Sequence, residues 1–215
     1  MNNDNGIKME KNRLELFSDA VFAIIITLLI IELKVPEGPD ILTNTDLSHK
    51  LGEMTGSLYS YFLSAAVVSS IWIGHHFIFQ FHVKNIDRWV IQINTLMLVL
   101  LALMPFSAAL LGRYPNFSTS LGLYGINILA VYLVNVVLVE YVWRSDNIEN
   151  GIVPTRIRKQ GKIRLYTAII CTILGLVCAM FGSQIAILFY IIPLIFSNVP
   201  GILNLLEKTF GFRIE

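Results

Sequence analysis

Three ionisable side chains lie within apolar segments of the sequence, where they could transfer protons or contact a permeating cation. Asp19 opens a first apolar run, and His75 and His76 lie inside a second. A charged group is costly in hydrocarbon and is usually paired or functional there, and imidazole titrates near neutral pH. Asp19 has three interpretations: it is solvated at a membrane surface, it anchors its helix to neighbouring helices, or it contacts ions or protons. For the histidines we expect a buried hydrogen-bonding role or pH sensing.

The residue types present do not favour other chemistries. Adjacent His75 and His76 lie about 100° apart on a helix, so they do not chelate as an i, i+4 pair would, and only His49 and His82 accompany them. We therefore expect no tightly bound metal and no cofactor. The sequence has no Gly-rich phosphate loop, Gly-x-Ser-x-Gly elbow or paired catalytic carboxylates, so it does not indicate an enzyme. A net charge of +1 provides no basic field for nucleic acid.

Membrane-spanning helices must position these residues. The 215-residue chain is 55% hydrophobic and 14% charged, whereas a soluble domain has about 25% charged residues. A span needs about 20 apolar residues, and six runs qualify, with polar loops expected at about 36–55 and 144–164. The sequence predicts an all-α membrane protein with a single domain, residues 1–215, and helices at about 14–35, 58–81, 89–111, 121–143, 165–181 and 185–206.

The placement of Lys and Arg predicts how these helices are oriented. With the N-terminus in the cytoplasm, 13 of the 16 Lys and Arg residues fall in cytoplasmic segments. Because cytoplasmic loops are enriched in these residues, both termini are expected in the cytoplasm, which requires an even number of spans. The basic segment 144–164 either contacts anionic membrane lipid or only sets this topology.

The polar residues of the first three helices form a specific pattern. It reads Arg13-x-x-x-Phe17-Ser18-Asp19 in the first helix, Trp72-Ile-Gly-His75-His76 in the second and Asn94 in the third. On six predicted spans, this pattern resembles the transmembrane protein 175 family, potassium-permeable channels of endosomes and lysosomes with shorter prokaryotic relatives. One six-helix repeat per chain is typical of the prokaryotic members. The resemblance implies a structural cluster of motif residues: Arg13, Phe17, Ser18, Asp19, Trp72, His75, His76 and Asn94.

The resemblance also implies a function and a site. It implies a homotetrameric, potassium-selective or potassium-permeable channel, a multi-pass protein of a prokaryotic plasma membrane, whose first helix lines a central pore. The family's constriction falls five residues after the motif's Asp, at Ile24 here, so potassium in transit is expected near Ile24 and Thr27. Asp19 lies about 140° from Ile24 on a helical wheel and is expected to face helices two and three. The wheel groups one stripe of residues: Ile24, Thr27, Leu28 and Ile31.

The residues allow other interpretations. Without the resemblance, an aliphatic stripe on an aliphatic helix is typical of ordinary helix packing. Arg13 lies within about 20° of the stripe, so it either pairs with an acid or precedes the regular helix. No Thr-Val-Gly-Tyr-Gly carbonyl filter occurs. The alternative function is a proton-coupled membrane transporter that uses Asp19 and His75/His76 as a relay, and a third is a membrane scaffold without transport.

Overall fold

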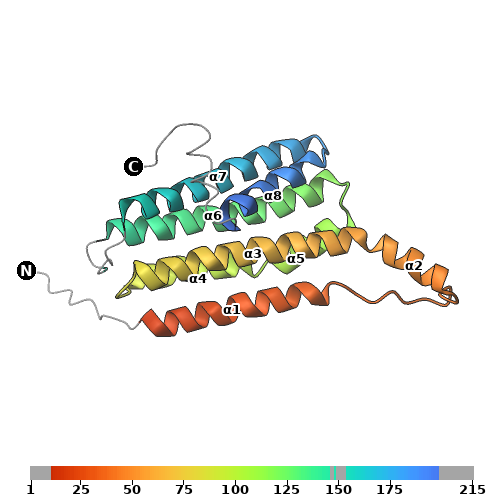
Figure 1. The fold of residues 1–215 in the computed structure, drawn as a ribbon, viewed down its shortest axis with the longest axis horizontal. Coiled ribbons are helices and arrows are strands. Elements are labelled where there is room, and N and C mark those ends of the chain that lie inside the picture. Colours follow the sequence, from red (N-terminus) through yellow and green to blue (C-terminus); the bar gives the residue numbers. More distant parts are fainter. Residues whose placement is uncertain (1–10, 146–147, 149–153, 199–215) are drawn as a thin grey trace, which may run out of the picture.

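The computed structural model describes residues 11–145, 148 and 154–198, and the regular elements of these residues are α-helices (Figure 1). They run along the long axis of an elongated bundle. In chain order they are α1 Lys11–Ile31, α2 Asn44–Glu53, α3 Thr55–Phe81, α4 Arg88–Leu101, α5 Met104–Arg113, α6 Ser118–Arg144, α7 Thr155–Met180 and α8 Ile185–Asn198.

Within the described residues, five helical stretches are long and apolar enough to cross a membrane, with α4 and α5 counted as one stretch. They correspond to the first five predicted spans, so the all-helical membrane prediction is confirmed. The sixth, α8, is a shorter apolar helix. Its predicted end at residue 206 lies outside the described residues.

The third predicted span is interrupted rather than continuous. α4 ends at Leu101 and α5 begins at Met104, with Ala102 and Leu103 in a turn. Pro105 explains the interruption, because proline has no amide hydrogen and its ring clashes with the carbonyl of the residue four positions earlier, here Leu101. The chain continues in the same direction, so one span is preserved.

α1 ends at Ile31, not at Val35 as predicted. Pro36 disfavours a helical conformation at the residue before it. The Leu33 amide donates to the Ile30 carbonyl at 3.0 Å, which is the three-residue spacing of a closing turn. Apolar residues thus continue past the point at which the helix stops.

The polar segment after α1, predicted as a loop, contains the helix α2. Its first turn is closed by a capping box: the Thr43 hydroxyl accepts from the Asp46 amide at 3.2 Å, and the Asp46 carboxylate accepts from the Thr43 amide at 2.8 Å. The hydroxyl and the amide of Thr43 together lower the pKa of Asp46. The capping box was missed because its third position holds Asp instead of the more usual Glu or Gln.

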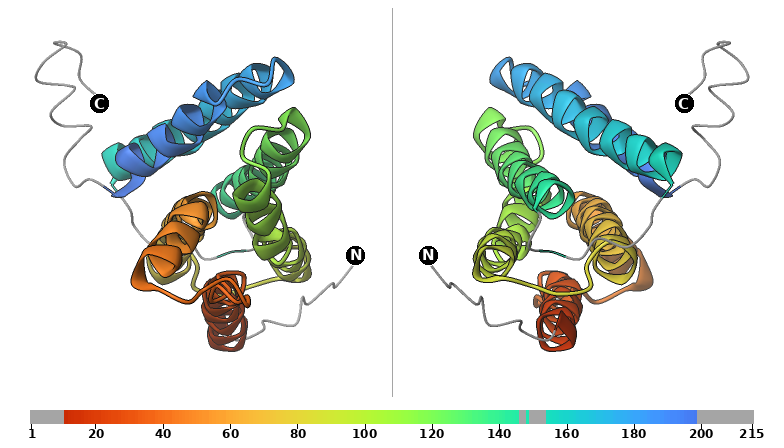
Figure 2. Two further views of the ribbon diagram at one scale, coloured as in Figure 1. Left: turned by 90° about the vertical axis from the view of Figure 1, so that its right-hand side faces the viewer. Right: turned by 90° about the vertical axis from the view of Figure 1, so that its left-hand side faces the viewer.

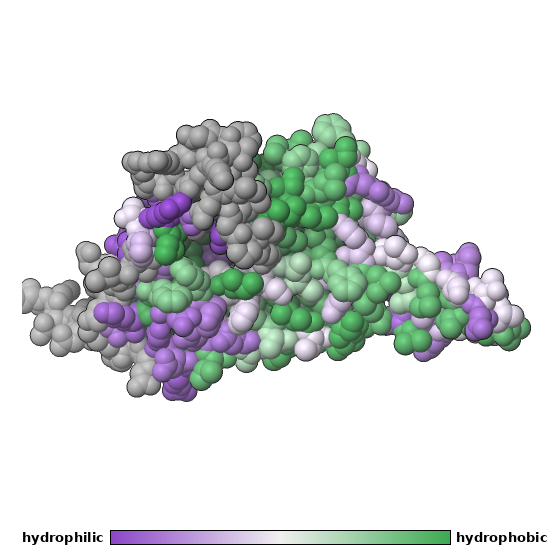
Figure 3. Space-filling view, viewed as in Figure 1, coloured by the Kyte–Doolittle hydropathy of each residue, from purple (hydrophilic) through white to green (hydrophobic). Residues whose placement is uncertain are grey.

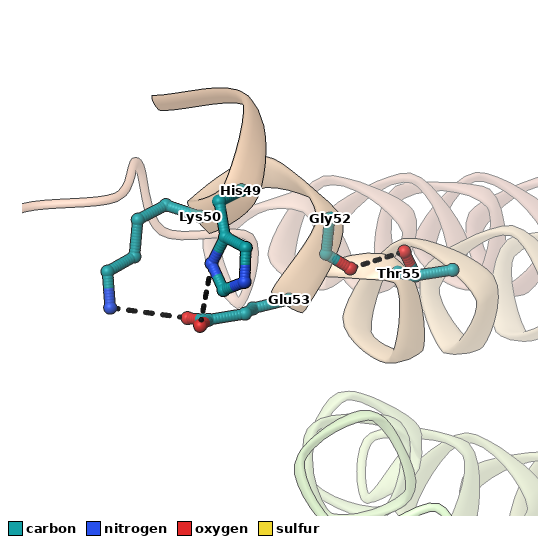
Figure 4. A network of polar contacts seen from close by, with 5 residues as sticks. All are labelled: His49, Lys50, Gly52, Glu53 and Thr55. Atoms are coloured by element: carbon teal, nitrogen blue, oxygen red, sulfur yellow. Dashed lines mark hydrogen bonds and ion pairs between the residues drawn. The ribbon is translucent and has the colours of Figure 1, made fainter. Parts of the chain in front are cut away.

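The last turn of α2 carries a second polar network, shown in Figure 4. The Glu53 carboxylate lies 3.3 Å from both His49 Nδ1 and Lys50 Nζ. The Thr55 hydroxyl then donates to the Gly52 carbonyl at 2.6 Å where α3 begins. α2 projects beyond the end of the bundle (Figure 1).

α7 begins at Thr155, not at residue 165 as predicted. The basic residues that follow Pro154 are therefore helical, because Arg, Lys and Gln are good helix formers. The apolar run shows which residues lie in the hydrocarbon layer, but it does not show where the helix begins. The turns formed by these basic residues pack on α6. There, Glu140 Oε1 lies 2.6 Å from Lys162 Nζ of α7, and Glu140 Oε2 lies 3.0 Å from Arg144 Nη2 of α6 itself.

The helices assemble as two groups joined by α6. α1 packs on α3, α4 and α5, while α6 contacts α4 and α5 on one side and α7 on the other (Figure 2). α7 and α8 form an antiparallel pair over α6. Hydrophobic residues cover the middle of the bundle, and hydrophilic residues gather towards its ends (Figure 3).

Tyr190 joins α8 to α6 and α7. Its hydroxyl donates to the Leu121 carbonyl of α6 at 3.1 Å, and its ring is 2% exposed. Gly125 of α6 and Gly175 of α7 leave the space for this ring, because a Cβ on Gly175 would lie 2.4 Å from Tyr190 Cε1. The two glycines are therefore a packing requirement.

Gly175→Ala is expected to destabilise the bundle by about 1–3 kcal/mol, because overpacking forces the ring or a helix to move. The measurement is thermal unfolding of the purified protein. Gly122→Ala is the matched control, since a Cβ at that position of α6 meets nothing within 4 Å. Equal stability of the Gly175 and Gly122 variants would contradict this packing account.

Candidate functional site

α1 has one packed face and one open face within the described structure. The packed face repeats every three or four residues: Leu14, Ser18, Phe22, Ile25 and Leu29 are buried. Opposite it, Ile24 is 56% exposed, Leu28 42% and Ile31 64%, and Thr27 is also exposed. Within the described residues, the apolar side chains of the stripe that the wheel predicts, Ile24, Leu28 and Ile31, thus remain exposed.

Thr27 is the polar residue of this stripe. Its hydroxyl donates to the Ile24 carbonyl at 2.8 Å. A hydroxyl has one donor and two acceptor lone pairs. Because the proton is directed to the backbone, the oxygen keeps acceptor capacity towards the open side.

A buried hydrogen-bonded chain connects α1, α3 and α4. Asn94 Nδ2 donates to Ser18 Oγ at 2.9 Å, and Asn94 Oδ1 lies 2.8 Å from His75 Nε2. Ser18 Oγ donates onward to the Leu14 carbonyl at 2.8 Å. Ser18, His75 and Asn94 have no exposed surface, so each depends on the others for its hydrogen bonds.

A second contact joins α1 to α3 closer to the surface. Trp72 Nε1 donates to Asp19 Oδ1 at 2.8 Å. His76 stacks on Trp72 with ring centroids 5.6 Å apart, and its Nδ1 lies 4.0 Å from Glu15 Oε1. Asp19 therefore faces α3, on a different side of α1 from Ile24. Among the described residues, no hydrogen bond connects Asp19 to His75 or His76.

The motif residues do not all join one cluster. The structure brings together Ser18, Asp19, Trp72, His75, His76 and Asn94. Arg13 and Phe17 lie apart from them on the open face of α1, where Phe17 is 54% exposed. The cause is helix geometry, because positions 13 and 17 lie within about 60° of Ile24 on a straight helix.

Two residues of this region were not singled out from the sequence. Glu15 approaches His76, and Lys11 Nζ donates to the Phe79 carbonyl at 3.1 Å. The available signal was the i, i+4 spacing of Glu15 and Asp19, which places both on one face. Within the described residues, no group of three or more His, Cys, Asp or Glu side chains is arranged to hold a metal ion.

Comparisons with known proteins include this segment. A family model described as the endosomal/lysosomal potassium channel TMEM175 matches residues 13–105. A protein named a potassium channel from Chryseobacterium sp. (strain P1-3) is 31% identical over 192 residues, which cover 89% of this chain and 94% of that protein. A potassium channel from Streptomyces collinus is 40% identical over 107 residues, 49% of each chain.

A mammalian relative and a solved structure extend the comparison. The endosomal/lysosomal proton channel TMEM175 of Bos taurus is 34% identical over 104 residues, which cover 46% of this chain and 22% of that protein. The crystal structure of a lysosomal potassium-selective channel TMEM175 homolog from Chamaesiphon minutus has a TM-score of 0.73 at 25% identity. That alignment covers 88% of this chain and 98% of the other.

Proposed function

Because the chain belongs to the TMEM175 family, we propose that it is a potassium-permeable cation channel whose pore is lined by the open face of α1. The observation that carries this proposal is the exposed stripe of Ile24, Thr27, Leu28 and Ile31. Within the described residues, Ile24 and Ile31 are more than half exposed, whereas Leu28 also borders a cavity between α1, α3 and α5. Four copies of the chain around one axis would turn each position of the stripe into a ring.

We propose that the chain acts as a homotetramer, because one α1 helix does not enclose a pore. Each chain offers a single open stripe, so closure requires copies related by rotation. The proposed assembly is a multi-pass protein of the plasma membrane of a prokaryote. Potassium passes through without being held as a cofactor.

The proposed constriction is the ring of Ile24 side chains. Isoleucine has no oxygen to replace the hydration water of an ion, so the barrier there depends on width and wetting. One turn further along α1, the Thr27 oxygens are the nearest acceptors. Size exclusion at Ile24 and coordination at Thr27 are thus two distinct sources of selectivity.

Single-channel recording in planar bilayers tests this function. Unitary potassium currents far above the turnover of a carrier are expected, and cross-linking in mild detergent is expected to trap species up to a tetramer. Slow electrogenic flux with a fixed proton stoichiometry would favour the transporter that uses Asp19 and the histidines, and an absence of flux would favour a scaffold. A strictly monomeric protein that conducts would overturn the proposed pore.

Thr27→Val is expected to bring the permeabilities of potassium and sodium together. The substitution keeps the shape and removes the oxygen, and losing about 1.4 kcal/mol of preferential coordination changes a ratio about tenfold. Reversal potentials under bi-ionic conditions measure this ratio. Thr27→Ser keeps the hydroxyl and is expected to keep the selectivity. An unchanged ratio in the valine variant would show that the aliphatic rings discriminate without Thr27.

A further inference from the structure

A cavity of about 380 Å³ lies between α3, α6 and α7, away from the open face of α1. This volume is within the range of about 300–1,000 Å³ that is typical of ligand sites. Apolar side chains form most of its lining, among them Ile71, Val139 and Leu165. Along α6 its lining runs from Trp143 in the last turn to Tyr132, about 17 Å along that helix.

The few polar groups of the lining include atoms that lack partners within the described part of the chain. Asn135 is 3% exposed, and its Oδ1 accepts no hydrogen bond there. Trp143 Nε1 and Arg164 Nε are likewise buried without an acceptor. A buried polar atom without a partner costs about 1–3 kcal/mol, so the two donors, Trp143 Nε1 and Arg164 Nε, indicate a site that an acceptor group of a ligand completes.

Basic side chains lie in the lining of the cavity and beside it. Arg164 lines it directly. Burial, and then the nearby charge of Arg158, lower the pKa of His82, which also lines it. Lys162 is held by Glu140 and lies over the Trp143 ring at 5.1 Å. Within the described residues Arg164 Nε has no acceptor, so the Arg164 guanidinium is available to an anion, and arginine suits phosphate.

We propose that this cavity binds an anionic phospholipid, with its phosphate at Arg164 and one acyl chain between α3 and α7. Basic pockets between spanning helices on the cytoplasmic side are typical sites for anionic headgroups. An acyl chain needs no hydrogen bonds, whereas a protein segment would bring backbone polar groups against a mostly apolar wall at considerable cost. The lipid therefore matches both the basic side chains and the apolar lining.

Two glycines allow substitutions that fill the cavity without removing packed side chains. Gly74 of α3 and Gly161 of α7 both line the cavity. A Cβ at Gly74 meets nothing within 4 Å, and one at Gly161 approaches only Trp143 Cη2, at 3.9 Å. A leucine at Gly74 would occupy the space of the acyl chain from the α3 wall. A leucine at Gly161, beside Trp143 and about one turn before Arg164, would narrow the cavity from the α7 wall next to the phosphate.

Native mass spectrometry of the full-length protein in mild detergent measures the lipid directly, independently of conduction. The probes are phosphatidylglycerol and phosphatidylcholine with identical acyl chains. We expect phosphatidylglycerol to be retained more strongly than phosphatidylcholine by the parent protein. Gly161→Leu, Gly74→Leu and Arg164→Gln are each expected to weaken that retention about tenfold, since a charge-assisted contact or the chain-binding space is lost.

Matched controls separate this site from general effects. Gly122→Leu adds the same side chain at an open position of α6 outside the lining, and Lys159→Gln removes one charge from the exposed side of α7. Both are expected to retain phosphatidylglycerol like the parent. Equal retention of the two lipids, or unchanged retention in the cavity variants, would overturn the proposal. A cavity variant that changes only the oligomeric state would assign the groove to a second copy of the chain instead.

Discussion

Ile24→Asn is expected to raise the unitary potassium conductance, by about tenfold for each 1.4 kcal/mol removed from the barrier. Ile24 is 56% exposed on the open face of α1 and does not hold the bundle together. An asparagine ring supplies oxygens and amide groups that stabilise water in the narrow region, so an ion keeps more of its hydration there. Single-channel recording in symmetrical potassium measures the change.

Ile30→Asn is the matched control for this prediction. Ile30 is 47% exposed on the same helix, but it lies about 120° from Ile24 around the helix axis. The control variant is therefore expected to conduct like the parent. If Ile24→Asn conducts like the parent while variants of Leu28 or Ile31 conduct more, the stripe is right and the constriction is misplaced. If no stripe variant responds, α1 does not line the pore.

The sequence predicted which side of α1 Asp19 occupies, because helical geometry alone separates it from Ile24. It did not identify the open face without the family resemblance. Ile24 and Ile25 are chemically identical, yet Ile24 is 56% exposed and Ile25 is 2% exposed. That difference comes from where α3, α4 and α5 lie, which a uniformly apolar helix does not encode in its own composition.

Helix ends were predicted well only where apolar residues and helix coincide. α3 ends at Phe81 as predicted. α7 starts before its apolar run, and α1 stops inside its own. Hydropathy measures how readily residues enter the hydrocarbon layer. Where a helix ends depends instead on nearby residues, such as Pro36 after α1 and Pro154 before α7. Such nearby residues also explain α2, whose capping box lies in a polar segment.

Polar residues in apolar helices identified the candidate site, but the spacing of the sequence did not show which of them form hydrogen bonds with each other. Asn94 and His75 were both singled out, and the structure joins them through a side-chain contact of 2.8 Å. Ser18 belongs to the same chain of hydrogen bonds, although its motif neighbour Phe17 points elsewhere. Register between separate helices decides which of these groups meet, and register depends on tertiary packing.

Asn94→Leu is expected to lower stability and to abolish or strongly reduce the potassium current. Leucine nearly matches asparagine in volume but leaves His75 Nε2 without its partner and removes the donor to Ser18 Oγ. Each buried group left unpaired costs about 1–3 kcal/mol. Because Asn94 connects α1 to α4, its loss also allows α1, the helix that carries Ile24 and Thr27, to shift or rotate relative to α4.

Asn127→Leu provides the comparison that separates positioning from stability alone. Asn127 is also buried, but it donates to Ser107 Oγ at 3.0 Å and so links α6 to α5. Its variant is expected to melt earlier while the assembled fraction keeps the parent's unitary conductance and selectivity.

The double variant Asn94→Leu/His75→Leu is a further test of this chain. Removing both partners of a buried hydrogen bond is nearly neutral compared with removing one, so the double variant is expected to regain part of the stability lost in Asn94→Leu. Thermal unfolding measures the recovery, and single-channel recording shows whether α1 regains its position. If Asn94→Leu keeps both the melting temperature and the current of the parent, the Ser18–Asn94–His75 chain does not hold α1, and apolar packing of Phe22, Ile25 and Leu29 must position the stripe by itself.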